Sequence, residues 1–158
     1  MRKIKGNLIH LAEQGEFDVL VQPCNCFCTM GAGFALQIKK SFPEAFAVDC
    51  KTAKGDKAKL GTYSKVDLKI DMPGLPHRRH QLTIVNAYTQ YHWRGQGVLA
   101  DYKAIESVFG RISQDFRPGL RIGIPKIGAG LARGHWPTIE KIIDEQMAGK
   151  DLTLVEFV

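Results

Sequence analysis

Hydrophobic residues follow two patterns along this chain, and the two patterns alternate from one end to the other. In the first pattern, apolar residues form short unbroken runs or alternate one by one with polar residues, as they do in β-strands. The runs at 18–23 and 81–88 are almost wholly apolar, which is typical of strands covered on both faces of a sheet. The segments that we predict as strands are 2–6, 18–23, 61–70, 81–88, 120–125 and 152–158.

In the second pattern, apolar residues recur every three or four positions, as on one face of an amphipathic helix. This spacing is clearest in 99–112, and Pro43 and Pro137 each fit the first turn of a helix. The segments that we predict as helices are 33–42, 43–55, 99–112 and 137–149. Because strands and helices alternate, we expect one α/β domain over residues 1–158. Its fold should be a three-layer α/β/α sandwich around a central mixed, mostly parallel sheet of about six strands.

Composition narrows the functional classes only a little. The chain has 158 residues, 44% of them hydrophobic, and a net charge of +6. No apolar run approaches the roughly 20 residues that cross a bilayer, so we expect a cytoplasmic monomer with no membrane partner. The positive charge permits an anionic partner, but it is scattered, apart from local clusters at 51–59 and 77–80. A nucleic-acid binder held by charge alone is therefore the weakest functional hypothesis.

Three cysteines alternate in the stretch PCNCFCTMGAG, and the fourth is Cys50. Alternate residues do not bridge easily, and zinc sites usually carry a second ligand pair downstream, which this sequence lacks. We therefore expect no metal and no cofactor, and we interpret Cys24, Cys26 and Cys28 as small residues lining a strand end and a loop. A role for Cys28 as a nucleophile would need a neighbouring base that the sequence does not show.

Two glycine loops carry the strongest chemical signal. CNCFCTMGAGFAL (24–36) and PKIGAGLARGHWP (125–137) each follow a predicted buried strand and lead into a predicted helix. Ligands of open α/β sheets lie at the carboxyl ends of the strands, and glycines let backbone N–H groups approach an anion closely. Helix N-termini add partial positive charge. Two such loops facing each other would form a cradle for a diphosphate.

These loops, together with GNLIHL (6–11) and IVNAYTQYHWRG (84–95), resemble the macrodomain family over nearly the whole chain. The resemblance is strongest to the branch of the DNA ADP-ribosylation antitoxin macrodomains, the terminal ADP-ribose glycohydrolase and the yeast ADP-ribose 1''-phosphate phosphatase. This branch also has phage-encoded members. The resemblance implies an α/β/α sandwich whose ligand is ADP-ribose or a derivative, including ADP-ribosylated protein or nucleic acid.

The resemblance also assigns ligand-binding roles to individual residues. Asn7 and Leu8 correspond to the adenine-recognising positions, although many macrodomains carry Asp where this chain has Asn7. Asn25 corresponds to the asparagine that bonds the distal ribose. The residues that would flank the distal ribose are Tyr88, Thr89 and Gln90. The residues that would form the two phosphate loops are Gly31, Ala32, Gly33 and Phe34 in the first, and Ile127, Gly128, Ala129, Gly130 and Leu131 in the second.

Two interpretations remain open for four aromatic residues, because each suits a core or rim position as well as a ligand contact: Tyr88, Tyr91, Trp93 and Phe157. Phe157 in particular is as compatible with the core as with a contact to adenine.

The expected catalytic groups of the resembled hydrolases are missing. The DNA-directed branch carries a catalytic lysine two residues before His-Trp, where this chain has Gln90, and the terminal glycohydrolase has an aspartate where this chain has Ala132. The remaining catalytic candidates are Asn25, which could position a water, and His135, whose imidazole suits proton transfer. A phosphomonoester needs a positioned water and donors more than a lysine. The sequence therefore favours slow hydrolysis of ADP-ribose 1''-phosphate to ADP-ribose and phosphate.

Two alternatives remain. The first is an ADP-ribosyl hydrolase that removes ADP-ribose from protein or nucleic acid, which needs a base that the sequence does not identify. The second is a non-catalytic reader, a protein that binds ADP-ribose without hydrolysing it and therefore does not need the missing lysine and aspartate.

Overall fold

The computed structural model describes all residues, 1–158, and contains one six-stranded sheet. The strand order is β1-β6-β5-β2-β4-β3, and every neighbouring pair is parallel except β3 and β4. This confirms the expected mixed, mostly parallel sheet. The strands are β1 (Arg2–Lys5), β2 (Val19–Cys24), β3 (Tyr63–Asp71), β4 (Arg79–Tyr88), β5 (Arg121–Ile124) and β6 (Asp151–Glu156).

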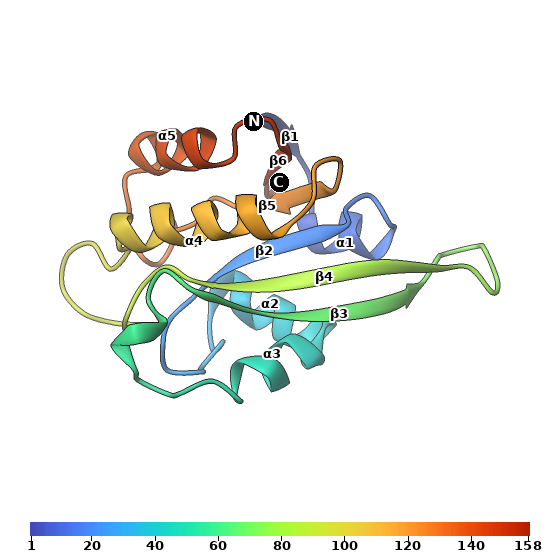
Figure 1. The fold of residues 1–158 in the computed structure, drawn as a ribbon. Coiled ribbons are helices and arrows are strands. Elements are labelled where there is room, and N and C mark those ends of the chain that lie inside the picture. Colours follow the sequence, from blue (N-terminus) through green and yellow to red (C-terminus); the bar gives the residue numbers. More distant parts are fainter.

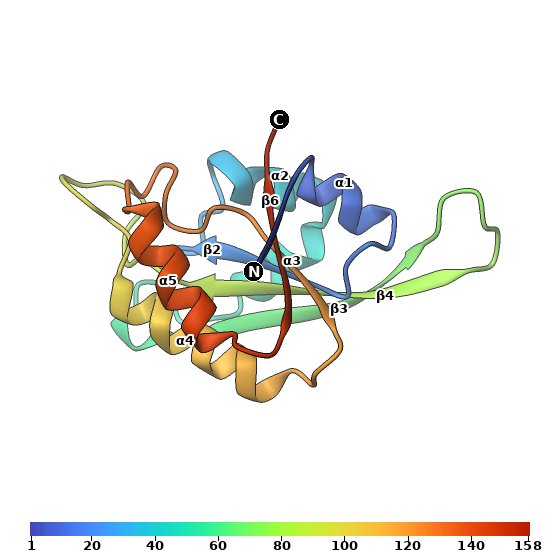
Figure 2. The same ribbon diagram turned by 90° about the horizontal axis from the view of Figure 1, so that it is seen from above.

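Helices cover both faces of the sheet, as the sandwich prediction requires (Figure 1). One face carries α4 and α5, and the other carries α1, α2 and α3 (Figures 1 and 2). The helices are α1 (Leu8–Glu13), α2 (Gly33–Ser41), α3 (Pro43–Asp49), α4 (Tyr102–Asp115) and α5 (Trp136–Gln146), with a short 3-10 turn η1 at Lys57–Lys59.

The alternating side chains of the central strands divide the core between these two faces. Along β2, Val19 and Val21 pack with α4 and α5, while Leu20 packs with α1, α2 and α3. A strand that is apolar on both sides packs into both cores at once, which is why the segment 18–23 is mostly apolar without alternation at Val19, Leu20 and Val21. The edge hairpin β3–β4 extends beyond the helical layers (Figure 2).

One helix falls well short of its predicted extent, and one helix is not predicted by the sequence pattern. The segment 43–55 is helical only to Asp49, and turns follow it. The helix α1 was not predicted, because its six residues are too few to establish a helical period. The Asn7 side chain caps α1 by accepting a hydrogen bond from the His10 N–H at 3.1 Å.

None of the helices has the length and apolar character needed to cross a membrane. No group of three or more His, Cys, Asp or Glu side chains is arranged to hold a metal ion.

Candidate functional site

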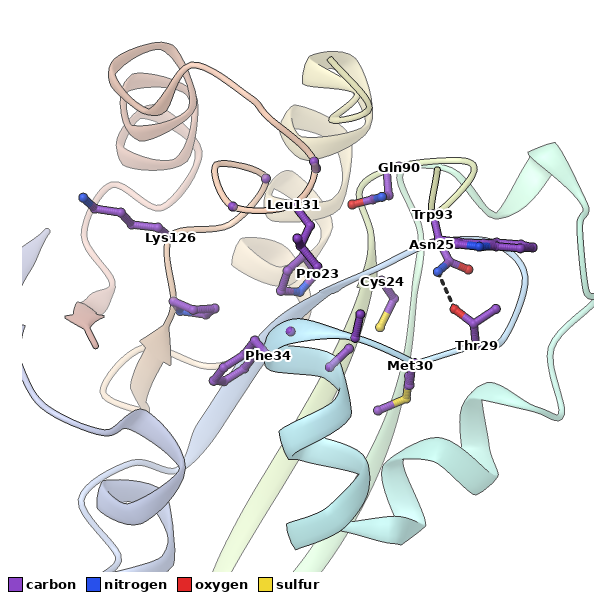
Figure 3. Close-up of a pocket in the computed structure, with 18 of the residues that line it drawn as sticks. Pro23, Cys24, Asn25, Thr29, Met30, Phe34, Gln90, Trp93, Lys126 and Leu131 are labelled. Carbon is purple, nitrogen blue, oxygen red and sulfur yellow. Dashed lines mark hydrogen bonds between the residues drawn. The ribbon is translucent and has the colours of Figure 1, made fainter. Parts of the chain in front are cut away.

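The two glycine loops lie side by side at the carboxyl edge of the sheet (Figure 3). The first follows β2 and the second follows β5, and these strands are parallel neighbours, so their ends meet at one edge. Gly33 begins α2 with a φ of 57°, and a Cβ at this position would lie 3.2 Å from Leu131 Cδ1 of the second loop. The loops therefore face each other closely, as the diphosphate cradle requires.

A narrow cavity of about 450 Å³ separates the loops. Its walls come from the end of β2, both glycine loops, the start of α2 and the segment after β4. The predicted site residues that line it are Asn25, Gly31, Ala32, Gly33, Phe34, Gln90, Gly128, Gly130 and Leu131. Nine residues from three segments of the sequence thus meet around one space.

A wider cavity of about 890 Å³ continues from the narrow one. Four residues line both cavities: Gly33, Phe34, Pro125 and Lys126. The predicted adenine residues Asn7 and Leu8 line the wider cavity, together with Phe157. Phe157 is 83% exposed, so it belongs to the cavity rim and not to the core. The two cavities form one cleft that is wide at the α1 end and narrow at the β4 end.

The middle of this cleft favours a negatively charged ligand. Ala32, the N-cap of α2, makes no side-chain capping bond, so the first N–H groups of this nine-residue helix have no side-chain partner there. Lys126 lies where the two cavities meet, and its Nζ approaches Glu156 only to 3.9 Å. This exposed ion pair is weak, so the ammonium group can bind an anion instead.

The narrow end of the cleft is polar and aromatic. Asn25 donates through Nδ2 to Thr29 Oγ1 at 2.7 Å and accepts through Oδ1 from the Phe27 N–H at 2.7 Å (Figure 3). These two bonds hold the Asn25 amide in one orientation. Trp93 lines the same end, is 42% exposed and stacks on the His92 ring with centroids 3.9 Å apart.

Five predicted site residues line neither cavity. Tyr88, Thr89 and Ile127 are buried, because the ends of their segments turn these side chains into the protein. The Tyr88 hydroxyl, for example, bonds to Asp49 Oδ1 at 2.7 Å. Ala129 is absent from both linings. His135 is exposed at the start of α5, where its Nδ1 pairs with Thr138 Oγ1 at 2.9 Å.

All four cysteines are free thiols in the structure. Burial raises the pKa of the Cys24 thiol well above its ordinary value, and burial also raises the pKa of Cys26 to about 11. Both thiols therefore stay protonated and unreactive near neutral pH. Cys28 does not line the cleft, and its Sγ donates to the Asp49 carbonyl at 3.2 Å. This placement gives no support to Cys28 as a nucleophile.

Several lining residues were not identified from the sequence. The narrow cavity also includes Pro23, Cys24, Thr29, Met30, Ala35, Asp49, Pro125, Lys126 and Ala132. Lys126 lies two residues before Gly128 of the second Gly-Ala-Gly motif, so its place in the sequence indicates the loop. Asp49 had no such signal, because it lies on a helix far from either motif.

Comparison with curated proteins finds relatives, although no protein-family model matches the chain. An uncharacterized 17.5 kDa protein of Enterobacteria phage T4 is 31% identical over 161 residues, which cover 99% of this chain and 96% of that protein. The DNA ADP-ribosyl glycohydrolase of Mycobacterium tuberculosis is 29% identical over 131 residues, which cover 81% of this chain. The match covers only 34% of the glycohydrolase, so this chain corresponds to about a third of that protein.

Solved structures with the same fold are macrodomains. The macrodomain of Mycobacterium tuberculosis DarG superposes with a TM-score of 0.70 at 22% identity, over 98% of this chain and 95% of that one. Thermosipho africanus DarTG, solved in complex with ADP-ribose, gives a TM-score of 0.77 at 19% identity, over 99% of this chain and 41% of that one. At these identities, the comparisons establish the fold.

Proposed function

The chain belongs to the macrodomain family and shares a family with the T4 protein, and on that premise we propose that it binds ADP-ribose and removes it from modified nucleic acid. The observation that carries this proposal is the continuous cleft between the two glycine loops. Adenine occupies the wide end beside Asn7 and Phe157. The diphosphate lies between the loops near Lys126, and the distal ribose reaches Asn25.

The chemistry of the cleft suits each part of this ligand. The wide end offers the apolar ring of Phe157 and the amide of Asn7 to a base. The narrow middle offers backbone N–H groups at the start of α2 and the Lys126 ammonium to two phosphates. The Asn25 amide, held by Thr29, can bond ribose hydroxyls. The DarTG structure with bound ADP-ribose supports the same ligand class.

Two observations favour nucleic acid as the modified partner. Curated relatives are named DNA ADP-ribosyl glycohydrolases, although this chain corresponds to only about a third of their length. In addition, the exposed Trp93 ring lies at the narrow end, where the group attached to the distal ribose would emerge. A flat indole of this kind stacks on a nucleobase, and such stacking does not depend on base identity.

The comparisons favour this glycohydrolase over the ADP-ribose 1''-phosphate phosphatase that the sequence ranked first. The side chains of the cleft do not by themselves distinguish the two reactions. Gln90 and Ala132 occupy the positions at which the resembled hydrolases carry their catalytic lysine and aspartate. Neither side chain can take up a proton at neutral pH. A direct comparison of substrates is therefore needed.

Binding and turnover can be measured separately. We expect calorimetric titration to give ADP-ribose an affinity at least about tenfold above that of AMP, with ADP between them. We then expect release of ADP-ribose from an ADP-ribosylated single-stranded DNA oligonucleotide, and slower or no release from ADP-ribosylated protein. Phosphate release from ADP-ribose 1''-phosphate alone would select the phosphatase. Tight binding without turnover of any substrate would select the reader, and no ADP-ribose binding would reject the proposal.

Trp93 and Phe157 provide a pair of variants for the two ends of the cleft. We expect Trp93→Ala to slow release from the oligonucleotide by roughly 5- to 100-fold, the range of one lost base stack, and to leave ADP-ribose affinity within about twofold. Phe157→Ala should instead weaken ADP-ribose and ADP equally, because both contain adenine. Equal effects of Trp93→Ala on the oligonucleotide and on free ADP-ribose would contradict a nucleobase contact at Trp93.

A further inference from the structure

Asp49 is a buried charged residue that the ligand contacts described above do not explain. It ends α3 and is only 1% exposed, yet it lines the narrow end of the cleft. Its Oδ1 accepts a hydrogen bond from the Tyr88 hydroxyl at 2.7 Å, while Oδ2 accepts none from the protein. Oδ2 is not among the fully enclosed side-chain atoms that lack a partner, so this oxygen keeps contact with the cavity that Asp49 lines. The unpartnered oxygen therefore points to a role toward whatever occupies the cavity.

The surroundings of Asp49 hold its carboxylate in place. The Tyr88 hydroxyl that donates to Oδ1 is also paired with Ser64 Oγ at 2.8 Å, so the phenol is fixed from two sides. The Lys59 ammonium lies 4.6 Å from the centre of the Tyr88 ring. Lys59 makes no ion pair with Asp49, because its Nζ donates to the Cys26 carbonyl at 3.0 Å. The carboxylate is thus positioned by the Tyr88 hydrogen bond, and Lys59 acts on it only through its charge.

The same surroundings make Asp49 more basic than an exposed aspartate. Burial raises its pKa, and this effect outweighs the Tyr88 hydrogen bond and the Lys59 charge, which lower it. The other titratable groups near the carboxylate are the thiols of Cys24, Cys26, Cys28 and Cys50. A carboxylate with a raised pKa accepts a proton from water more readily than an ordinary one.

We propose that Asp49 is the general base of this protein, an inference that rests on the proposed hydrolase function. Asp49 Oδ2 takes a proton from a water molecule as the water oxygen bonds to the anomeric carbon of the distal ribose. The bond from that carbon to the modified group breaks, and its electron pair leaves with the group. The leaving atom takes up a proton from solvent and the protonated Asp49 releases its proton to solvent, so the net reaction consumes one water. Asp49 supplies the proton transfer for which Gln90 and Ala132 are unsuited.

Asp49→Asn tests the assignment, because the amide keeps the size of the carboxylate and can still accept from Tyr88. We expect release of ADP-ribose from the oligonucleotide to fall by at least about 100-fold, as for loss of a general base. ADP-ribose affinity and the melting temperature should stay near those of the unmodified protein. Asp71→Asn is the matched control, since Asp71 is an exposed carboxylate on the β3–β4 hairpin. It should change none of these quantities.

Tyr88→Phe gives a second test that a merely structural role would not satisfy. Removing the hydroxyl removes a hydrogen bond that lowers the pKa of Asp49, so that pKa should rise. The acidic limb of the pH–rate profile should therefore move to higher pH, whereas it should disappear in Asp49→Asn. Tyr88 acts here as a positioning residue.

The outcomes separate this inference from the proposed function. An unmodified protein that releases ADP-ribose, with Asp49→Asn equally active or Tyr88→Phe unshifted, would overturn the role of Asp49 alone. If Asp49→Asn does not fold, the shift in Tyr88→Phe decides. An unmodified protein without hydrolysis would overturn both.

Discussion

At Gly33 the first glycine loop turns into α2 through a backbone conformation that side chains disfavour. Its φ is 57°, and a Cβ would lie 3.2 Å from Leu131 Cδ1 across the cleft. Gly33→Ala should therefore cost about 1–2 kcal/mol of backbone strain and weaken ADP-ribose binding by roughly tenfold, because the methyl group enters the diphosphate region. Titration calorimetry and thermal melting would measure both effects.

Gly74 is the matched control for Gly33. It lies at the tip of the β3–β4 hairpin with a φ of 70°, and a Cβ there would meet no atom within 4 Å. Gly74→Ala carries a similar backbone strain but should leave ADP-ribose affinity unchanged. Equal losses of affinity in the two variants would mean that global destabilisation, and not the cleft, explains the Gly33 effect.

At the scale of elements, one arginine joins the second glycine loop to the segment that carries Trp93. Arg133 donates from Nε to the Gly97 carbonyl at 2.7 Å and from Nη2 to the Gly95 carbonyl at 2.6 Å. Arg133→Ala removes both bonds, so amide hydrogen exchange in residues 94–98 should accelerate. Release from the oligonucleotide should slow by a few fold, or roughly 1 kcal/mol, while ADP-ribose affinity changes little. The exposed Arg117→Ala is the control, and unchanged exchange in Arg133→Ala would refute the link.

At the scale of the whole molecule, an ion pair that stabilises the fold lies at the end of the sheet opposite the cleft. Asp18 precedes β2, and its Oδ1 accepts from Arg121 Nη2, at the start of β5, at 3.0 Å. Burial raises the pKa of Asp18, but the hydrogen bonds and charge of Arg121 outweigh it, and the pKa lies below its ordinary value of 3.8. The pair therefore stabilises the fold fully above that pH and is lost as the pH falls through the folded pKa.

Asp18→Asn should separate stability from function. We expect a loss of about 2 kcal/mol in the free energy of unfolding near neutral pH, or roughly 5 °C in Tm. The difference from the unmodified protein should shrink as the pH falls below about 4, and ADP-ribose affinity should not change. Denaturant titration at several pH values would measure this. A difference that stays constant down to low pH would refute the contribution of the Asp18 charge.

Local sequence patterns predict the element order, the sandwich and the pair of glycine loops. The spacing of apolar residues indicates which face of a helix or strand is buried. A Gly-Ala-Gly motif at a strand end indicates a backbone conformation that favours glycine. Both signals are contained within a few consecutive residues. These patterns miss α1, because a six-residue helix held by the Asn7 cap has no period to detect.

Which side chains face the cleft depends on long-range packing that no local pattern in the sequence reports. Tyr88 and Asp49 illustrate the reason, since they lie 39 positions apart and are joined by one hydrogen bond. The position of Tyr88 beside a motif predicts a ligand contact. In the structure Tyr88 is buried and bonds to Asp49 at the end of α3, a helix that carries no recognisable motif. The direction of a side chain depends on how sheet and helix pack, and that packing sums contacts from the whole chain.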